Sequence, residues 1–366
     1  METKVYKIEN INRDQKAIRA GAALIRQGQT VAFPTETVYG LGANALDGQA
    51  VNRIFKAKGR PNDNPLIVHI ADPSHFEALA HDVSARVPLL VREFWPGPLT
   101  IILKKSPRVP PETTAGLDTV ALRMPNHPIA LSLIQESGTP IAAPSANRSG
   151  RPSPTTAQHV LDDLSGRIPM ILDGITPCRV GLESTVLDMS GDIPTILRPG
   201  GITPGMLEKV LGHVKIDGAV LEPLDMRQAP RSPGMKYNHY SPRAHVIIYR
   251  GQALGAMVGE IKKIAAKYQY DGQKVGILAT DETMDRYREG LVISLGSRRE
   301  PAVLAANLFA SLREFENRGV DVILAEWVDE REEGLAIMNR MVRAAGFHVV
   351  DIEKPVEHKT KGDKRK

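Results

Sequence analysis

The chain has 366 residues, of which 42% are hydrophobic and 24% charged, a composition typical of a globular protein with room for two domains. No apolar run approaches the roughly 18 residues of a membrane-spanning helix, and the first residues lack the apolar core of a signal peptide. We therefore expect a cytoplasmic protein without a membrane partner. The net charge of +5 suits an anionic ligand such as ATP or RNA without selecting one, and the single cysteine, Cys178, excludes an internal disulfide.

The first two hundred residues predict strands and helices that do not alternate in strict βαβ order. A helix is expected over 13–27, a short strand over 30–33 and a second helix over 48–57. This irregular order predicts a twisted, mixed sheet of the α/β or α+β type. Further strands are expected at 119–123, 140–143, 169–172, 184–188 and 195–198, and further helices at 128–137, 155–164 and 203–211.

The stretch from Thr30 to Asn44 carries polar side chains directly after a buried strand. Pro34 ends the strand because proline has no N–H to donate, and the hydroxyl and carboxylate side chains of residues 35–37 follow. Gly40 and Gly42 come next. This pattern indicates either a ligand-binding loop or an ordinary turn between a strand and a helix.

Four cations stand where they could surround one polyanion. Lys58 and Arg60 occupy a loop that prolines stiffen, and such a loop can hold phosphates, although a solvated charge cluster is the commoner alternative. Arg123 and Arg198 each end an apolar strand, where a buried cation needs an anionic partner. The segment 142–153 adds small residues with hydroxyl and amide side chains, but it is not a Walker A loop. No Ser-His-Asp or Cys-His spacing and no Cys/His metal cluster stands out.

The composition changes between residues 212 and 243. Residues 221–242 contain four prolines and show no periodicity, which is typical of an interdomain linker. From 244 to 352, strands at 245–249, 274–278, 291–295 and 320–324 alternate with helices at 254–267, 301–318 and 333–345. This alternation predicts a small, Rossmann-like, doubly wound parallel sheet, without the G-x-G-x-x-G of a dinucleotide site.

Several segments in family order resemble the YrdC-type threonylcarbamoyl-AMP synthases. They are PTETVYGLGANA, AKGRPNDNPLIVHI, WPGPLT, VALRMPNHP, APSANRSGRPSPT, ESTV and LRPG. The later PGMKYNHYSP and GLAIMNRMVRAAGF resemble the longer, two-domain form. The resemblance covers residues 5–352 and implies a catalytic domain at 5–211 with a concave basic face, a linker at 212–243 and a second domain at 244–352. Residues 353–366 match nothing in the family, and we expect a disordered basic tail with at most weak RNA contact.

The resemblance also implies the reaction. The family makes L-threonylcarbamoyl-AMP and pyrophosphate from L-threonine, bicarbonate or CO2, and ATP, with Mg²⁺ arriving on the ATP. A partner enzyme then transfers the threonylcarbamoyl group to the tRNA adenosine beside the anticodon. Carried over by motif, the threonine-binding residues are Thr35, His69, Arg123, Ala143 and Ser184. The nucleotide-binding residues are Lys58 and Arg60, which we also expect to be catalytic, and Asn64, Thr119, Ser145, Asn147, Ser153 and Arg198.

The linker prompts a further hypothesis. An acyl adenylate is hydrolysed by water, so a site that makes one benefits from a lid. We expect Pro233–Tyr240 to fold over the nucleotide, with Lys236 reaching phosphate and a tyrosine such as Tyr240 covering the intermediate; the alternative is a segment that merely packs the two domains together.

Two other functions compete with the synthase. One is an enzyme that uses carbamoyl phosphate, although residues 245–351 look too small and too poor in sites for the extra catalytic domains. The other is an RNA-binding module, although aromatic residues make up only 5% of the chain and do not interleave with the basic loops. Threonine-dependent exchange between ATP and pyrophosphate distinguishes all three.

Overall fold

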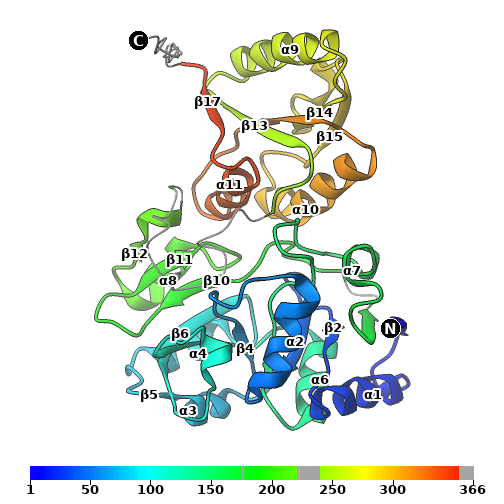
Figure 1. Cartoon of the computed structure of the whole chain (residues 1–366). Coiled ribbons are helices and arrows are strands. Elements are labelled where there is room, and N and C mark those ends of the chain that lie inside the picture. Colours follow the sequence, from blue (N-terminus) through cyan, green and yellow to red (C-terminus); the bar gives the residue numbers. More distant parts are fainter. Residues whose placement is uncertain (175–176, 221, 223–239, 354–366) are drawn as a thin grey trace, which may run out of the picture.

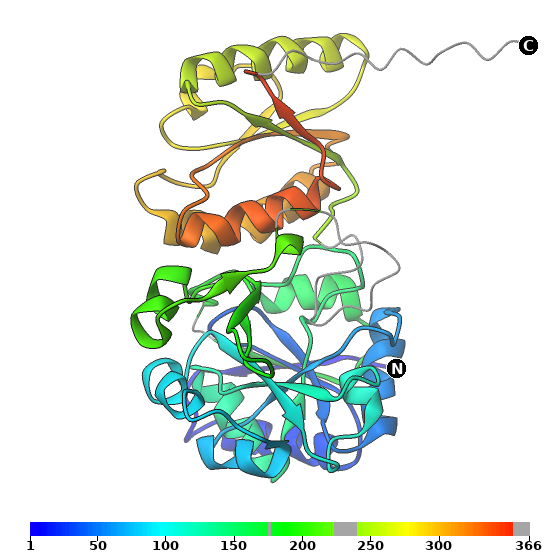
Figure 2. The same cartoon turned by 90° about the vertical axis from the view of Figure 1, so that its left-hand side faces the viewer.

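The computed structural model describes residues 1–174, 177–220, 222 and 240–353. Two sheets lie in two lobes, one stacked on the other (Figures 1 and 2). Lys236, most of the predicted lid and all but the first residue of the predicted tail lie outside the described residues. Within the described ranges, no helix has the length and apolar character needed to cross a membrane.

The first lobe contains a 12-stranded sheet with both parallel and antiparallel neighbours, which confirms the predicted mixed sheet. Its strands are β1 (Lys4–Ile8), β2 (Val31–Phe33), β3 (Gly40–Asn44), β4 (Ile67–His69), β5 (Ala80–His81), β6 (Leu99–Lys105), β7 (Thr119–Arg123), β8 (Ile141–Ala142), β9 (Met170–Gly174), β10 (Thr185–Asp188), β11 (Thr195–Arg198) and β12 (Lys215–Ile216). They are arranged in the order β1-β9-β2-β3-β8-β4-β7-β6-β10-β11-β12, and β5 pairs with β6. The sheet thus extends to residues 215–216, inside the segment predicted as a linker.

Helices cover this sheet and bury apolar side chains against it. Ile18 and Leu133, from the first and sixth helices, share one core cluster, while Val51 and Ile54 of the second helix belong to another. The helices are α1 (Gln15–Arg26), α2 (Gly48–Lys58), α3 (Phe76–Leu79), α4 (Val87–Phe94), α5 (Pro111–Thr114), α6 (Pro128–Ser137), α7 (Ala157–Leu164) and α8 (Pro204–Leu211), with 3-10 turns at Pro73–His75 and Gly218–Val220.

The polar stretch after β2 leads into a strand, so the interpretation as a turn between strand and helix is wrong. β3 returns antiparallel to β2, with Phe33 opposite Gly40 and Val31 opposite Gly42. A Cβ at Gly42 would lie 2.6 Å from Ile141 and 2.7 Å from the Phe33 ring. Glycine is therefore required by close packing, and its low strand propensity hid β3 from sequence analysis.

The second lobe is a five-stranded sheet in which all paired strands are parallel, in the order β15-β14-β16-β13-β17. This confirms the predicted small parallel sheet, although β16 begins two residues later than expected and β17 was not predicted. The strands are β13 (His245–Arg250), β14 (Val275–Ala279), β15 (Leu291–Ser294), β16 (Val322–Glu326) and β17 (Val349–Asp351), and the helices are α9 (Leu254–Tyr270), α10 (Pro301–Asn317) and α11 (Glu333–Ala344), with a 3-10 turn at Met284–Arg286.

Helices lie on both faces of the second sheet. Helix α9 buries Met257 and Ile261 against one face, whereas α10 and α11 bury Phe309 and Ile337 against the other. Figure 2 shows that α10 and α11 lie on the side that faces the first lobe. The second domain therefore meets the first through two helices.

Gly276, in the middle of β14, offers a test of this packing. A Cβ there would lie 2.6 Å from the ring of Phe315, which is completely buried on α10. Gly276→Ala should lower the free energy of unfolding by about 1–3 kcal/mol through overpacking. Gly259→Ala is the matched control, because that exposed position in α9 has open space; it should raise stability by about 0.5–1 kcal/mol. Urea unfolding followed by circular dichroism measures both, and equal changes would contradict the packing.

Candidate active site

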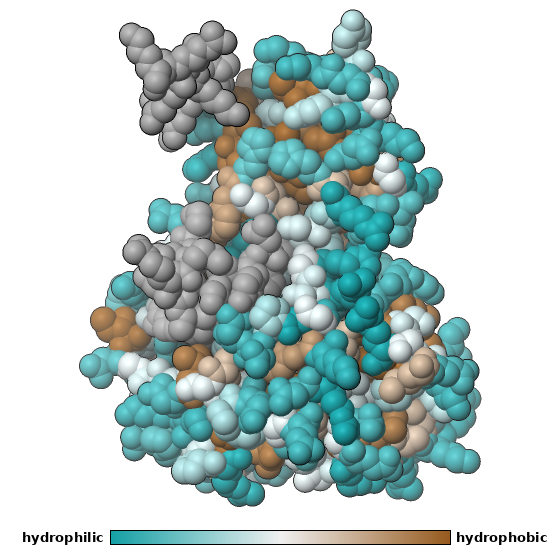
Figure 3. Space-filling model, in the orientation of Figure 1, coloured by the Kyte–Doolittle hydropathy of each residue, from teal (hydrophilic) through white to brown (hydrophobic). Residues whose placement is uncertain are grey.

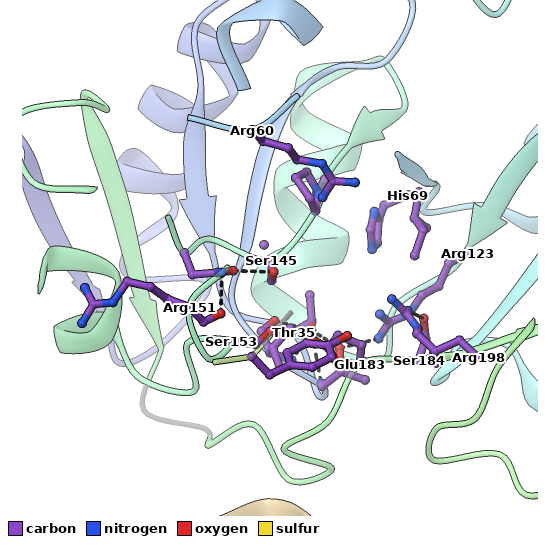
Figure 4. A pocket seen from close by; sticks show the side chains of 18 residues that line it. Thr35, Arg60, His69, Arg123, Ser145, Arg151, Ser153, Glu183, Ser184 and Arg198 are labelled. Atoms are coloured by element: carbon purple, nitrogen blue, oxygen red, sulfur yellow. Dashed lines mark hydrogen bonds between the residues drawn. The ribbon is translucent and has the colours of Figure 1, made fainter. Parts of the chain in front are cut away.

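A pocket opens in the first lobe where several strands end (Figure 4), and Tyr240 is one of its lining residues. Parallel β4 and β7 place His69 directly beside Arg123, and antiparallel β10 and β11 place Arg198 opposite Val186. Side chains far apart in the sequence therefore meet. The pocket is lined by Thr35, Thr37, Val38, Gly40, Arg60, Ile67, His69, Arg123, Ala143, Pro144, Ser145, Asn147, Arg151, Ser153, Glu183, Ser184, Arg198 and Tyr240.

Arg123 already has the anionic partner that its burial demands. Its Nη2 donates to Glu36 Oε1 at 2.6 Å and to Thr37 Oγ1 at 3.1 Å, while Nε donates to the Gly97 carbonyl at 3.3 Å. The sequence predicted the need for an anion, and the chain itself supplies it. Within the described residues Nη1 has no protein acceptor, so that edge of the guanidinium is available to a substrate carboxylate.

His69 is buried beside Arg123 and is neutral. Burial and then the Arg123 charge lower the pKa of its imidazole to about 3. Its Nδ1 has no hydrogen-bond partner among the described residues. A buried, unpaired nitrogen in a pocket wall is suited to a ligand that brings the missing partner.

Lys58 does not lie in a solvated loop, as the commoner interpretation of the K-x-R pair suggested. It ends α2, is 2% exposed, and its Nζ donates to the Ser145 carbonyl at 2.5 Å and the Asn147 carbonyl at 2.6 Å. Burial and then Arg60 hold the pKa of Lys58 well below its usual value. Lys58 therefore fixes the segment 145–147 from behind and does not line the pocket.

Gly59 separates the roles of the two basic residues. It has a positive φ of 61° and ends α2, so the chain turns and Arg60 reaches the pocket. The Nη2 of Arg60 donates to the carbonyls of Asn64 and Pro65 at 3.3 and 3.4 Å. Asn64 itself is 1% exposed, and its side-chain amide has no partner among the described residues.

The segment 145–153 is shaped by its own amide and hydroxyl groups. Ser145 Oγ donates to Asn147 Oδ1 at 2.5 Å, and Asn147 Nδ2 donates to the carbonyls of Arg148 and Arg151 at 2.7 and 2.9 Å. Ser153 Oγ donates to Glu183 Oε1 at 2.5 Å. These bonds hold the loop in one shape along the pocket (Figure 4).

Ser184 is held on two sides by residues of the first lobe. Its Oγ lies 2.7 Å from Thr100 Oγ1 and accepts a bond of 3.1 Å from Arg198 Nη2. Arg198 Nε also donates to the Ser184 carbonyl at 3.0 Å. Burial lowers the pKa of Arg198 to about 10, so it remains a cation at neutral pH.

Some predicted residues do not line the pocket. Thr119 begins β7, four positions before Arg123, which places it about 13 Å along the strand from that side chain. Lys58 and Asn64 lie behind the surface, and Lys236 is not described. Sequence analysis missed several lining residues that adjoin predicted ones: Thr37, Val38, Gly40, Ile67, Pro144, Arg151 and Glu183. The signal for Glu183 was its place in the ESTV segment, directly before Ser184.

Two models of known protein families together match most of the chain. A family model described as "Telomere recombination" matches residues 23–200, and one described as "Threonylcarbamoyl-AMP synthase, C-terminal domain" matches residues 202–346. The threonylcarbamoyl-AMP synthase of Bacillus subtilis is 48% identical over 354 residues, 96% of this chain and 100% of that protein. The Pyrococcus abyssi threonylcarbamoyl-AMP synthase is 50% identical over 336 residues, 92% of this chain and 96% of that protein.

A solved structure extends the likeness to three dimensions. The crystal structure of P. abyssi Sua5 complexed with L-threonine is 48% identical, covers 95% of this chain and 99% of that chain, and has a TM-score of 0.89. The fold and these comparisons define a two-domain α/β enzyme. The chain belongs to the threonylcarbamoyl-AMP synthase family in its two-domain form, which confirms the resemblance seen in the sequence.

The state of His69 can be tested by NMR. Its Hε1 resonance, assigned by comparison with His69→Gln, should not titrate between pH 5 and 8 in the folded protein, whereas in urea it should titrate near 6.5. Because the folded pKa is depressed, the unfolded state binds more protons between pH 6.5 and 3, and stability should fall as the pH decreases through that window. A folded-state midpoint near 6.5 would contradict the buried, neutral imidazole.

Proposed function

We propose that this pocket forms L-threonylcarbamoyl-AMP and pyrophosphate from L-threonine, bicarbonate or CO2, and ATP. The observation that carries the proposal is the meeting of Arg60, Arg123 and Arg198 around one pocket that also contains hydroxyl side chains. Such a site can hold a carboxylate, a polyphosphate and a hydroxy amino acid together. The concave face of the first sheet around the pocket would be its basic binding surface.

Threonine would occupy the end of the pocket near Arg123. The Nη1 edge of Arg123 would bind its carboxylate, and Ser184 and Thr35 would contact its hydroxyl or carbamate. The neutral His69 suits this place because an imidazolium would be buried next to the like charge of Arg123. Ala143 leaves room for the substrate beside the strand end.

ATP would occupy the other end, along the segment 145–153. Arg60, Ser145 and Ser153 line the pocket there, and Tyr240 is also a lining residue. Arg198, which the motif also assigns to the nucleotide, lies beside Ser184 between the two ends. Lys58 and Asn147 would hold the loop that the phosphates contact. Asn64, Thr119 and Lys236 belong to the nucleotide prediction by motif alone.

The chemistry needs positioning more than a strong base. The threonine amine and CO2 give a carbamate, whose oxygen attacks the α-phosphorus of ATP while the bond to pyrophosphate breaks. Fixed cations stabilise the charge that develops on the phosphate oxygens. Among the described residues no group of three His, Cys, Asp or Glu side chains could hold a metal ion. This donor set fits a Mg²⁺ ion held mainly by phosphate oxygens and water.

The product of this reaction is unstable in water and is the substrate of a further transfer. It is a mixed anhydride that water hydrolyses, so we expect a partner enzyme to receive it and transfer the threonylcarbamoyl group to tRNA beside the anticodon. Contact between this chain and tRNA would be weak and sensitive to salt.

The proposed domain division is 5–211, 212–243 and 244–352, with a tail at 353–366.

The function is tested by incubating the chain with ATP, bicarbonate and threonine and detecting threonylcarbamoyl-AMP by mass spectrometry. Pyrophosphate release that depends on both threonine and bicarbonate is expected. Release without threonine, or RNA binding without any turnover, would favour the competing functions.

Arg60 and Lys58 should differ when each is replaced by alanine. Arg60→Ala removes a cation that faces the pocket and should lower turnover by at least about 10²-fold with little change in stability. Lys58→Ala should lower turnover and also lower the melting temperature, because two buried carbonyl groups lose their donor. Pyrophosphate release and thermal unfolding measure both effects. If the two variants had the same melting temperature, Lys58 would not hold the loop.

Substrate choice gives a further test. Valine lacks the hydroxyl that Thr35 and Ser184 would bind, so those groups would be left unpaired, and discrimination can then reach about 10⁴-fold. Valine should be rejected and serine used poorly in threonine-dependent pyrophosphate release. Equal rates of pyrophosphate release with valine and threonine would contradict the proposed contact between the substrate hydroxyl and Thr35 or Ser184.

A further inference from the structure

Arg340, on α11 of the second domain, is completely buried against the first domain. Its Nε donates to Glu183 Oε2 at 2.8 Å, and its Nη1 donates to the Pro199 carbonyl at 2.9 Å. Its Nη2 donates to the Glu183 carbonyl at 3.3 Å. The guanidinium also lies 5.6 Å from the ring centroid of Tyr240, which lines the pocket. One side chain of the second domain therefore contacts two parts of the pocket wall.

Glu183 passes this contact on to the nucleotide side of the pocket. Its Oε2 accepts the hydrogen bond from Arg340 Nε, and its Oε1 accepts the hydrogen bond from Ser153 Oγ. Burial by itself would raise the pKa of Glu183, but Arg340 and then Arg198 lower it below its usual value. The carboxylate is therefore ionised, and Ser153 is oriented by an anion that Arg340 holds in place.

A second arginine of the same domain fixes the residue before Ser153. Arg313, on α10, is 3% exposed and donates through Nη2 to the Pro152 carbonyl at 2.6 Å and to Asp163 Oδ2 at 2.8 Å. The domain boundary there is tightly packed, since a Cβ on Gly181 would lie 2.3 Å from the Cα of Ala306. Both arginines therefore act on a short segment of the first domain from a closely fitted surface.

Ser184, in contrast, is held by its own domain. Thr100 and Arg198 bond its hydroxyl, and neither belongs to the second domain. The influence of α11 through Glu183 should therefore reach the nucleotide half of the pocket and largely spare the threonine half.

We propose that Arg340 is a positioning residue for the synthase reaction: through Glu183 it sets the orientation of Ser153 and so the shape of the nucleotide half of the pocket. Arg313 supports the same segment at Pro152. The second domain thereby contributes to nucleotide binding without touching the reacting atoms. This inference rests on the proposed function, because it takes Ser153 to face ATP.

The test uses the full chain with Arg340→Met and Arg340→Lys, and calorimetric titration with a non-hydrolysable ATP analogue and, separately, with L-threonine. Arg340→Met should weaken binding of the analogue by about tenfold or more, since small misplacements of a binding group are costly. Arg340→Lys should fall in between, because a single ammonium group cannot reproduce the planar fork. Threonine binding should change by less than about threefold. Arg318→Met, at an exposed position beyond α10, is the matched control and should leave both affinities unchanged.

A double-mutant cycle separates positioning from general damage. In a Ser153→Ala background, Arg340→Met should add little further loss of analogue binding, because the path through Ser153 is already broken. Arg340→Lys keeps a cation beside Glu183 and should remain folded, which circular dichroism checks. Additive losses, equal losses of threonine and analogue binding, or unchanged binding in both Arg340 variants would overturn the inference. A wild-type chain that bound no nucleotide would instead overturn the proposed function, and this inference with it.

Discussion

Buried arginines paired with buried carboxylates hold this molecule together around its pocket. Arg123 pairs with Glu36, Arg313 with Asp163 and Arg340 with Glu183, and each of the three arginines is less than 5% exposed. Removing one partner of such a pair leaves an uncompensated charge in the interior, which typically costs about 3–5 kcal/mol. The pairs therefore constrain how the helices, strands and loops that carry them pack around the pocket, because both partners of a pair have to meet.

The same constraint prepares the site for its chemistry. Cations whose positions are already determined by protein partners need little reorganisation when a charged substrate binds. Arg123 shows how this works, since Glu36 and Thr37 hold one edge of the guanidinium while the Nη1 edge remains available. Lys58 is the extreme case, because its Nζ donates to two carbonyl groups of the loop that lines the pocket and does not itself face the pocket.

The sequence predicted elements well where local signals agree. Helix α6 begins at Pro128 and ends before Gly138, as expected from a proline at the first turn and a glycine with positive φ after the last. The prediction from sequence failed where tertiary packing decides the conformation, as in β3, where Ile141 and the Phe33 ring leave room only for a glycine at position 42. Burial of Lys58 and the choice of Glu36 as the partner of Arg123 depend on distant segments, so no local pattern could reveal them. Arg340 lay inside a recognised segment, but its contact with Glu183 spans the domain boundary and had no signal of its own.

The close fit at Gly181 and Ala306 bears on how this protein can change over evolutionary time. Any larger side chain at Gly181 would collide with the backbone of α10, and the glycine has a positive φ of 70°. The surfaces of the two domains must therefore diverge together. Chimeras that combine the first domain of one relative with the second domain of another would inherit mismatched contacts on the wall of the pocket. Exchange of one domain by recombination would therefore be costly wherever these contacts differ, even though each half is a recognisable unit of sequence.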